Sequence, residues 1–109
     1  GSIMGLTTSN FLNELIIPKA FLGAWGISFK EGLTDTHLLE IELKKFIVSR
    51  ANEVIVLVDG SKFQQTGISA YANISQISRI ITDSSAPLDE VEKFRQAGVE
   101  VLVADSTDQ

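Results

Sequence analysis

Hydrophobic residues along the chain fall into two patterns, one typical of helices and the other of buried strands. Residues 8–17, residues 36–51 and a third segment ending at Gly98 carry apolar positions three or four residues apart, as on one face of a helix. Val54–Val58 is apolar throughout, which is typical of a strand covered on both faces. The other predicted strands are the apolar runs 19–27, 79–83 and 99–104.

Polar residues at the ends of the segments support the helices. Thr8 or Ser9 can cap the first helix, and Pro18 ends it. Asp35 or Thr36 is expected to cap the second. In each helix one apolar stripe should be buried: Phe11, Leu12, Leu15 and Ile16 in the first, Leu39, Leu43, Phe46 and Ile47 in the second, and Leu88, Val91 and Phe94 in the third.

The third helix has the clearest boundaries. Ser84 or Ser85 is expected to cap it, and Pro87 should lie in its first turn. Gly98 is expected to end it in the left-handed conformation that glycine adopts without strain.

Strands that alternate with helices predict an α/β fold with a mainly parallel sheet flanked by helices, formed by residues 1–109 as one domain. The weak alternation in 68–77 leaves that segment ambiguous, with an edge strand as one possibility. Right-handed crossovers place the carboxyl ends of parallel strands at one edge, where open α/β sheets bind ligands. The residues expected at that edge are Gly23–Gly26, Asp59–Lys62, Asp83 and Asp105.

Composition narrows the classes of function. The net charge of −5 makes this chain a poor DNA binder by itself, because DNA affinity comes from neutralised phosphates. With no cysteine and with His37 as the single histidine, disulfides, thiolate nucleophiles and histidine-rich metal sites are excluded. The apolar runs are far too short to cross a bilayer, and no signal-peptide pattern is present. We therefore expect a cytoplasmic globular domain that makes no membrane contact.

The turn Asp59–Lys62 follows the most apolar strand and contains the first candidate site. The Lys62 ammonium suits a phosphate or carboxylate, and Ser61 adds a donor. Asp59 can accept from sugar hydroxyls or hold Lys62 in place. The alternative is a solvated turn in which Asp59 caps the next segment.

The segment Gly23-Ala24-Trp25-Gly26 is the second candidate. Its glycines allow the backbone to approach a ligand closely, but it lacks the third glycine of a dinucleotide-binding motif. Trp25 can stack on a sugar face or pack at a domain or subunit interface. His37 is interpreted as a surface or capping residue, because nothing in the sequence completes a nucleophilic triad with it.

Five motifs, in this order and spacing, resemble the effector domain of DeoR-family repressors over residues 5–104. They are Ala20–Ile27, Glu31–Thr34, Val58–Phe63, Ile80–Asp83 and Ala97–Val101. The resemblance implies the ribose-5-phosphate-isomerase-like fold reused as a sensor. It also implies that DNA is bound by an N-terminal winged helix-turn-helix, which these 109 residues do not contain, and that a phosphorylated sugar relieves repression. The first part of the sensor domain, including the Thr/Ser-rich loop that cradles the phosphate, is likewise expected to lie outside these residues.

The same resemblance argues against catalysis. The isomerases carry an Asp-Gly-Ala-Asp pattern, which matches Leu22, Gly23, Ala24 and Trp25 here, so both acids are missing. The position that resembles their catalytic glutamate is Lys44, which can add a cation to the site or point to solvent. Moving a proton between adjacent carbons requires a base within reach of the substrate, and these positions offer none.

The leading hypothesis is thus a non-enzymatic, cofactor-free sensor that binds a phosphorylated sugar, in a regulator that forms a homo-oligomer. Its predicted ligand-binding residues are Gly23, Ala24, Trp25, Gly26, Lys44, Asp59, Ser61 and Lys62. The alternatives are an enzyme related to the sugar-phosphate isomerases and a module that acts mainly in oligomerisation.

Overall fold

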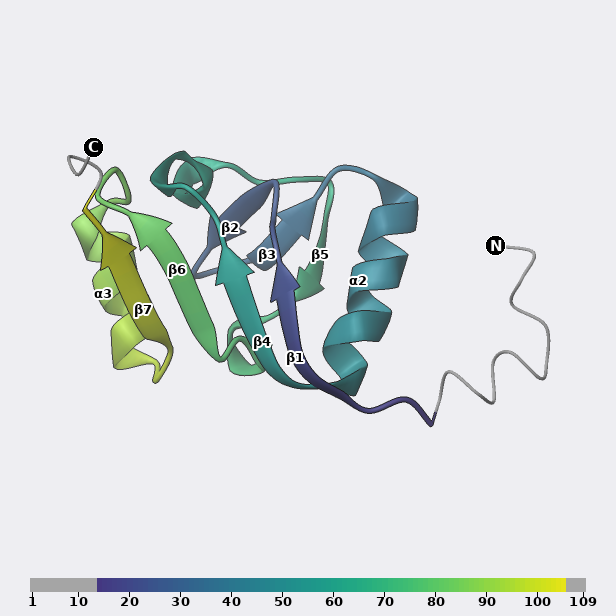
Figure 1. Ribbon diagram of the computed structural model, residues 1–109. Helices are drawn as coiled ribbons and strands as arrows, with labels where there is room; N and C mark the ends of the chain where they lie inside the picture. The colour runs from purple at the N-terminus through teal and green to yellow at the C-terminus, as the bar shows by residue number, and fades with distance from the viewer. Residues whose placement is uncertain (1–13, 106–109) are drawn as a thin grey trace.

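The computed structural model describes residues 14–105, which form two sheets and two α-helices (Figure 1). The strands are β1 (Ile17–Leu22), β2 (Gly26–Ser28), β3 (Gly32–Asp35), β4 (Ala51–Leu57), β5 (Ser69–Ala72), β6 (Arg79–Asp83) and β7 (Glu100–Ala104). The helices are α2 (Leu38–Arg50) and α3 (Leu88–Gln96), with short 3-10 helices η1 (Gly60–Gln64) and η2 (Ile74–Gln76). Neither α2 nor α3 is long and apolar enough to cross a membrane.

The larger sheet has four parallel strands in the order β1-β4-β6-β7. The connection from β1 to β4 contains β2, β3 and helix α2, and helix α3 connects β6 to β7. Apolar runs rich in β-branched residues form the central strands, because parallel strands bury their side chains. The α/β fold with a mainly parallel sheet is therefore confirmed.

The smaller sheet is antiparallel, in the order β2-β3-β5, and the sequence pattern did not predict it. The run 19–27 is not one strand, because β1 ends at Leu22 and β2 begins at Gly26. Strands this short leave little alternation to detect. Their fully buried residues, Ile27 and Leu33, join the core of the larger sheet.

The core lies between the larger sheet and the elements packed behind it. Its centre is Phe94 of α3, whose ring makes edge-to-face contacts with Phe29 and Phe63. Val91 is buried as predicted, but Leu88 is exposed. The N-cap of α3 is Pro87 rather than a serine, and Gly98 has the expected positive φ, 96°.

The face that helix α2 turns to the core differs in part from the predicted one, because Ile47 packs against the core as expected but Leu39 and Leu43 do not. Ile41 and Val48 are buried, whereas Leu39 and Leu43 are 81% and 59% exposed. The error arises because apolar residues surround most of this helix, so their spacing does not single out one face. The N-cap is His37, without a side-chain capping bond, and not Asp35 or Thr36.

The predicted helix 8–17 lies mostly outside the described residues. Of its residues, Leu15 and Ile16 are not helical and Ile17 begins β1. The ambiguous segment 68–77 contains β5, which is an edge strand of the smaller sheet, followed by η2.

Candidate functional site

The turns that follow β1, β4 and β6 lie next to one another at the carboxyl edge of the larger sheet. A methyl group placed on Gly23 would lie 3.7 Å from the carbonyl oxygen of Leu57. The Gly60 amide donates to the Asp83 carboxylate at 3.3 Å, and the Ser85 amide donates to the same oxygen at 2.9 Å. A hydrogen bond from the Ser85 hydroxyl, together with those from the two amides, keeps the pKa of Asp83 below its usual value. The first two predicted ligand-binding segments are thus neighbours.

The turn Asp59–Lys62 forms the start of η1. Asp59 is its N-cap and accepts hydrogen bonds from the amide of Ser61, at 2.9 Å, and from the Ser61 hydroxyl. The Asp59 carboxylate therefore caps the following helix, which was the alternative to its holding Lys62 in place. Within the described residues it makes no ion pair with Lys62. The Lys62 side chain is partly buried, and its ammonium has no hydrogen-bond or ion-pair partner within residues 14–105.

The segment Gly23–Gly26 makes its close backbone approach to the protein itself. A side-chain carbon at Gly26 would overlap the carbonyl group of Gln65, just after η1. The Trp25 amide donates to the Thr34 carbonyl at 3.0 Å, and the indole is partly exposed. Gly26 is therefore required for packing between the loops, whereas Gly23 has room beside it.

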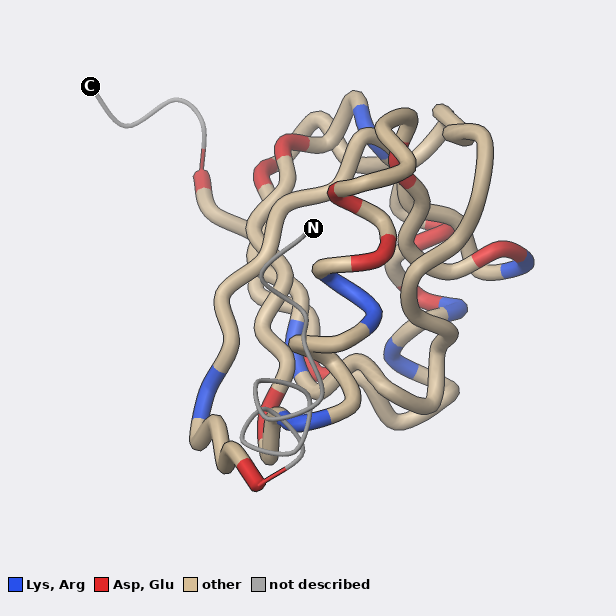
Figure 2. The backbone as a smooth tube through the Cα atoms, turned by 90° about the vertical axis from the view of Figure 1, so that its right-hand side faces the viewer, with Lys and Arg blue, Asp and Glu red and all other residues tan. Residues whose placement is uncertain are grey.

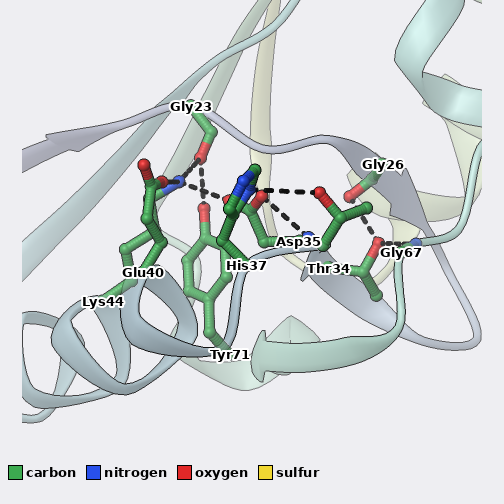
Figure 3. A network of polar contacts seen from close by, with 10 residues as sticks. Gly23, Gly26, Thr34, Asp35, His37, Glu40, Lys44, Gly67 and Tyr71 are labelled. Carbon is green, nitrogen blue, oxygen red and sulfur yellow. Dashed lines mark hydrogen bonds and ion pairs between the residues drawn. The ribbon is translucent and has the colours of Figure 1, made fainter.

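Lys44 points into this edge and not to solvent (Figure 3). Its Nζ lies 2.6 Å from the Asp35 carboxylate and donates to the Gly23 carbonyl oxygen at 3.1 Å. Glu40 lies 3.5 Å away, and the ring centroid of Tyr71 lies 5.1 Å away. The Lys44 and Asp35 side chains are only 17% and 10% exposed. Lys44 thus reaches the candidate site with its charge already paired.

Asp35 and Tyr71 complete this network, and the sequence did not identify either as a site residue. The Tyr71 hydroxyl donates to the same Gly23 oxygen at 2.5 Å (Figure 3). Asp35 and Lys44 come from different elements, β3 and α2, and no motif joins them to β5. The one available signal is that Tyr71 is the single tyrosine of the chain, placed among small residues.

Asp35 and Tyr71 each keep a single protonation state at neutral pH, for electrostatic reasons. Burial raises the pKa of Asp35, but the hydrogen bonds from Lys44 and the Thr36 amide, with the positive charge of Lys44, lower it below the usual value. Burial and the nearby carboxylates of Asp35 and Glu40 raise the pKa of Tyr71 far above its usual value. Asp35 is therefore a paired carboxylate and Tyr71 a neutral donor.

The arrangement is better suited to binding than to catalysis. The carboxylates nearest the edge are used by the protein: Asp59 caps η1, Asp35 pairs with Lys44, and Asp83 binds two amides. No group of three His, Cys, Asp or Glu side chains that could hold a metal occurs within residues 14–105. On the side of the molecule seen in Figure 2, Lys and Arg are mixed with Asp and Glu, without a continuous basic stripe.

Two shallow hollows lie away from the Asp59–Lys62 turn. One, of about 330 Å³, lies beside β5 and is lined by Lys45, Ala70, Tyr71, Ala72, Asn73 and Gln76. The other, of about 420 Å³, is lined by Phe29, Lys93, Gln96 and Ala97. None of the predicted ligand-binding residues lines either hollow.

Two buried threonines near the edge provide a matched test of packing. The Thr34 hydroxyl donates to the Gly26 carbonyl at 3.2 Å and accepts from the Gly67 amide at 2.8 Å. The Thr82 hydroxyl has no partner within the described residues. Thr34→Val should therefore cost about 2 kcal/mol of stability, whereas Thr82→Val should be neutral or gain up to about 1 kcal/mol. Urea unfolding of both variants measures this, and equal losses would contradict the bonding described.

Comparisons with known proteins place the chain among transcription regulators. A sequence profile of the DeoR C-terminal sensor domain matches residues 1–84. The chain is 39% identical over 89 residues to the HTH-type transcriptional regulator IolR of Bacillus subtilis, covering 82% of this chain and 35% of the relative.

Two further relatives are similar over more of the chain. The HTH-type transcriptional regulator GolR of Listeria innocua is 28% identical over 104 residues, which is 95% of this chain and 41% of the relative. The putative aga operon transcriptional repressor of Escherichia coli O157:H7 is 32% identical over 102 residues, which cover 94% of this chain and 38% of the relative. The chain thus spans less than half the length of the curated relatives it matches.

Proposed function

Because the chain belongs to the DeoR family of transcription regulators, as part of a C-terminal sensor domain, we propose that it binds a phosphorylated sugar and leaves it chemically unchanged. The regulator would bind DNA through a separate part of the polypeptide, in a repressor of sugar metabolism. The family relationship agrees with the motifs identified in the sequence and with the expectation of a non-catalytic domain.

The observation that supports the proposal most strongly is the environment of Lys62. Its partly buried ammonium lies at the carboxyl edge of a parallel sheet, where α/β folds bind ligands, without a partner in the described residues. A phosphate bound there would neutralise this cation at short range. Lys44, by contrast, is already paired with Asp35 at 2.6 Å.

Other predicted ligand-binding residues lie at the same edge of the sheet as this cation. The Ser61 hydroxyl donates to Asp59 and can still accept from a sugar hydroxyl. The exposed indole of Trp25 can cover one face of a sugar. Asp59 can still accept from a sugar hydroxyl through its second carboxylate oxygen, because both of its hydrogen bonds from Ser61 end on Oδ1.

The enzyme alternative is disfavoured by the same geometry. The Asp35 carboxylate is bonded to the same Lys44 ammonium as the Gly23 carbonyl, and its lowered pKa together with this bond make it a weak base. Homo-oligomerisation stays a prediction, favoured by the outward-facing Leu39 and Leu43 of α2.

Thermal unfolding in the presence of sugar phosphates tests the proposal. At a ligand concentration ten times the Kd, binding should stabilise the regulator by about 1.4 kcal/mol, enough to raise its Tm measurably. Lys62→Ala should abolish the response to phosphorylated compounds. Lys45→Ala, which alters an exposed lysine of α2, should respond like the wild type.

Two outcomes would contradict the proposal. If Lys62→Ala retains the wild-type shift, the ligand does not use this cation and the site is assigned wrongly. If any sugar phosphate in the panel is converted to product, the chain is an enzyme and the sensor hypothesis is wrong.

A further inference from the structure

Helix α2 carries an apolar stripe that no element within residues 14–105 covers. Leu39, Leu43 and Phe46 follow one another at intervals of four and three residues, so they fall within about 60° of one another around the helix. The buried residues of α2, Ile41 and Val48, lie on the opposite side. Leu39 and Leu43 are mostly exposed, at the end of the molecule opposite α3 (Figure 1). Large apolar side chains grouped on one exposed face indicate a binding partner.

The charges beside the stripe indicate the kind of partner. On one flank of the stripe, Glu42 and Lys45 are exposed and form a long ion pair, at 3.8 Å. On the other flank the charges bind within the molecule. Glu40 lies 3.5 Å from Lys44, and Arg50 donates to a backbone carbonyl just before β1 at 3.0 Å. The first flank therefore offers a partner one exposed charge of each sign.

An antiparallel pair of α2 helices from two copies matches these charges. A two-fold axis perpendicular to both helices brings each flank against the same flank of the partner. With the axis at Leu43, near the centre of the stripe, Glu42 of one copy lies within about 1.5 Å, measured along the helix, of the partner's Lys45. Parallel helices would instead bring this flank against the flank that contains Arg50, which is already bonded.

We propose that two copies of the regulator pair through this stripe, with their α2 helices antiparallel and Leu43 of each copy beside the two-fold axis. Leu39 of one copy then packs near the partner's Phe46. Two ion pairs between Glu42 and Lys45 of different copies form at the rim. Exposed charges of this kind contribute little to affinity and more to the orientation of the two partners.

The pairing is separate from the candidate ligand site. Lys44 leaves α2 on the side away from the stripe and donates to the Gly23 carbonyl at 3.1 Å. The inference therefore does not depend on which ligand is bound, and its failure would leave the proposed sugar-phosphate site untouched. One helix from each copy makes an interface smaller than a stable dimer normally needs, so other contacts of the whole regulator would add to it.

Disulfide cross-linking of the whole regulator tests the pairing, because these 109 residues contain no cysteine. Any cysteine elsewhere in the regulator is replaced by serine. Leu43→Cys places two thiols beside the axis, whereas Leu39→Cys places them about 12 Å apart along the helices, beyond the reach of a disulfide. Under mild oxidation, Leu43→Cys should form linked dimers about tenfold faster than Leu39→Cys. Leu88→Cys, at an exposed leucine of α3, is the control and should link as slowly as Leu39→Cys.

Charge exchange tests the orientation of the two helices. In the Leu43→Cys variant, adding Lys45→Glu places two negative charges against each other across the axis and should slow the linking several-fold. Adding Glu42→Lys as well restores opposite charges, and the rate should return to that of Leu43→Cys alone.

Four outcomes would overturn the proposal. Equal linking at positions 43 and 88 would show random collision. Faster linking at position 39 than at position 43 would show a parallel or shifted pair. A thiol at position 43 that neither links nor reacts with a small alkylating reagent would show that another part of the same polypeptide covers the stripe. A rate that the second charge change does not restore would show that Glu42 and Lys45 do not meet across the axis.

Discussion

Gly26→Ala is expected to destabilise the protein by about 3 kcal/mol or more, because the new methyl group would overlap backbone atoms that cannot rotate away. The group it meets is the carbonyl of Gln65, with the Thr34 hydroxyl 3.0 Å away. Relieving the overlap requires the loop after β1 to separate from the segment after η1. The first of these segments contains Gly23–Gly26, and the second directly follows η1, in which Ser61 and Lys62 lie.

Gly23→Ala is the matched control in the same loop. Its methyl group would make an ordinary contact, 3.7 Å from the Leu57 carbonyl oxygen, and should cost less than about 1 kcal/mol. Urea unfolding of the two variants gives the comparison. Equal stability of the two variants would show that the loops are not packed as described.

Asp35→Ala is expected to cost about 2–3 kcal/mol, because it leaves the Lys44 ammonium largely buried without its closest partner. The loss is smaller than for a fully buried pair, since solvent reaches part of both side chains. Replacing both residues, as Asp35→Ala with Lys44→Met, should recover part of the stability, because no charge is then left unpaired. Glu42→Ala, which breaks an exposed pair with Lys45, should leave stability unchanged within error.

The Asp35–Lys44 pair also predicts a dependence on pH. The pKa of Asp35 is lower in the folded protein than its usual value of 3.8. The ionised carboxylate therefore contributes its full stabilisation above that value, and the contribution is lost as the pH falls through the lowered pKa. Unfolding measured between neutral pH and pH 2 should show a weaker acid dependence in Asp35→Asn than in the wild type. Identical profiles would mean that Asp35 is not stabilised by Lys44.

The parts of the fold that could be predicted are those with strong, uniform patterns. Val54–Val58 predicted the central strand because every residue in it is apolar, and Gly98 marked the end of α3. The smaller sheet could not be predicted, because strands such as Gly26–Ser28 are too short to show alternation. The buried face of helix α2 was hard to predict, because apolar residues lie on several sides of this helix. Which side is buried depends on the elements that pack against it.

The sequence predicted which turns lie together at this edge of the sheet, but not the hydrogen bonds and the ion pair that the side chains there form. Strand ends identified the turns at Gly23 and Asp59, since parallel topology brings them to one edge. The ion pair of Lys44 with Asp35 joins side chains from two elements, and its formation depends on the antiparallel hairpin that the pattern missed. Tyr71 reaches the same edge only because β5 pairs with β3.

The carbonyl oxygen of Gly23 accepts from both Lys44 and Tyr71, which commits its two lone pairs. The peptide group after β1 is thereby anchored from a helix and from the smaller sheet at once, and rotating it would break two bonds together. A small molecule that binds to this peptide group contacts a rigid surface, so the protein loses little conformational entropy on binding. Rigidity of this kind favours one ligand shape over others that would need the loop to adjust.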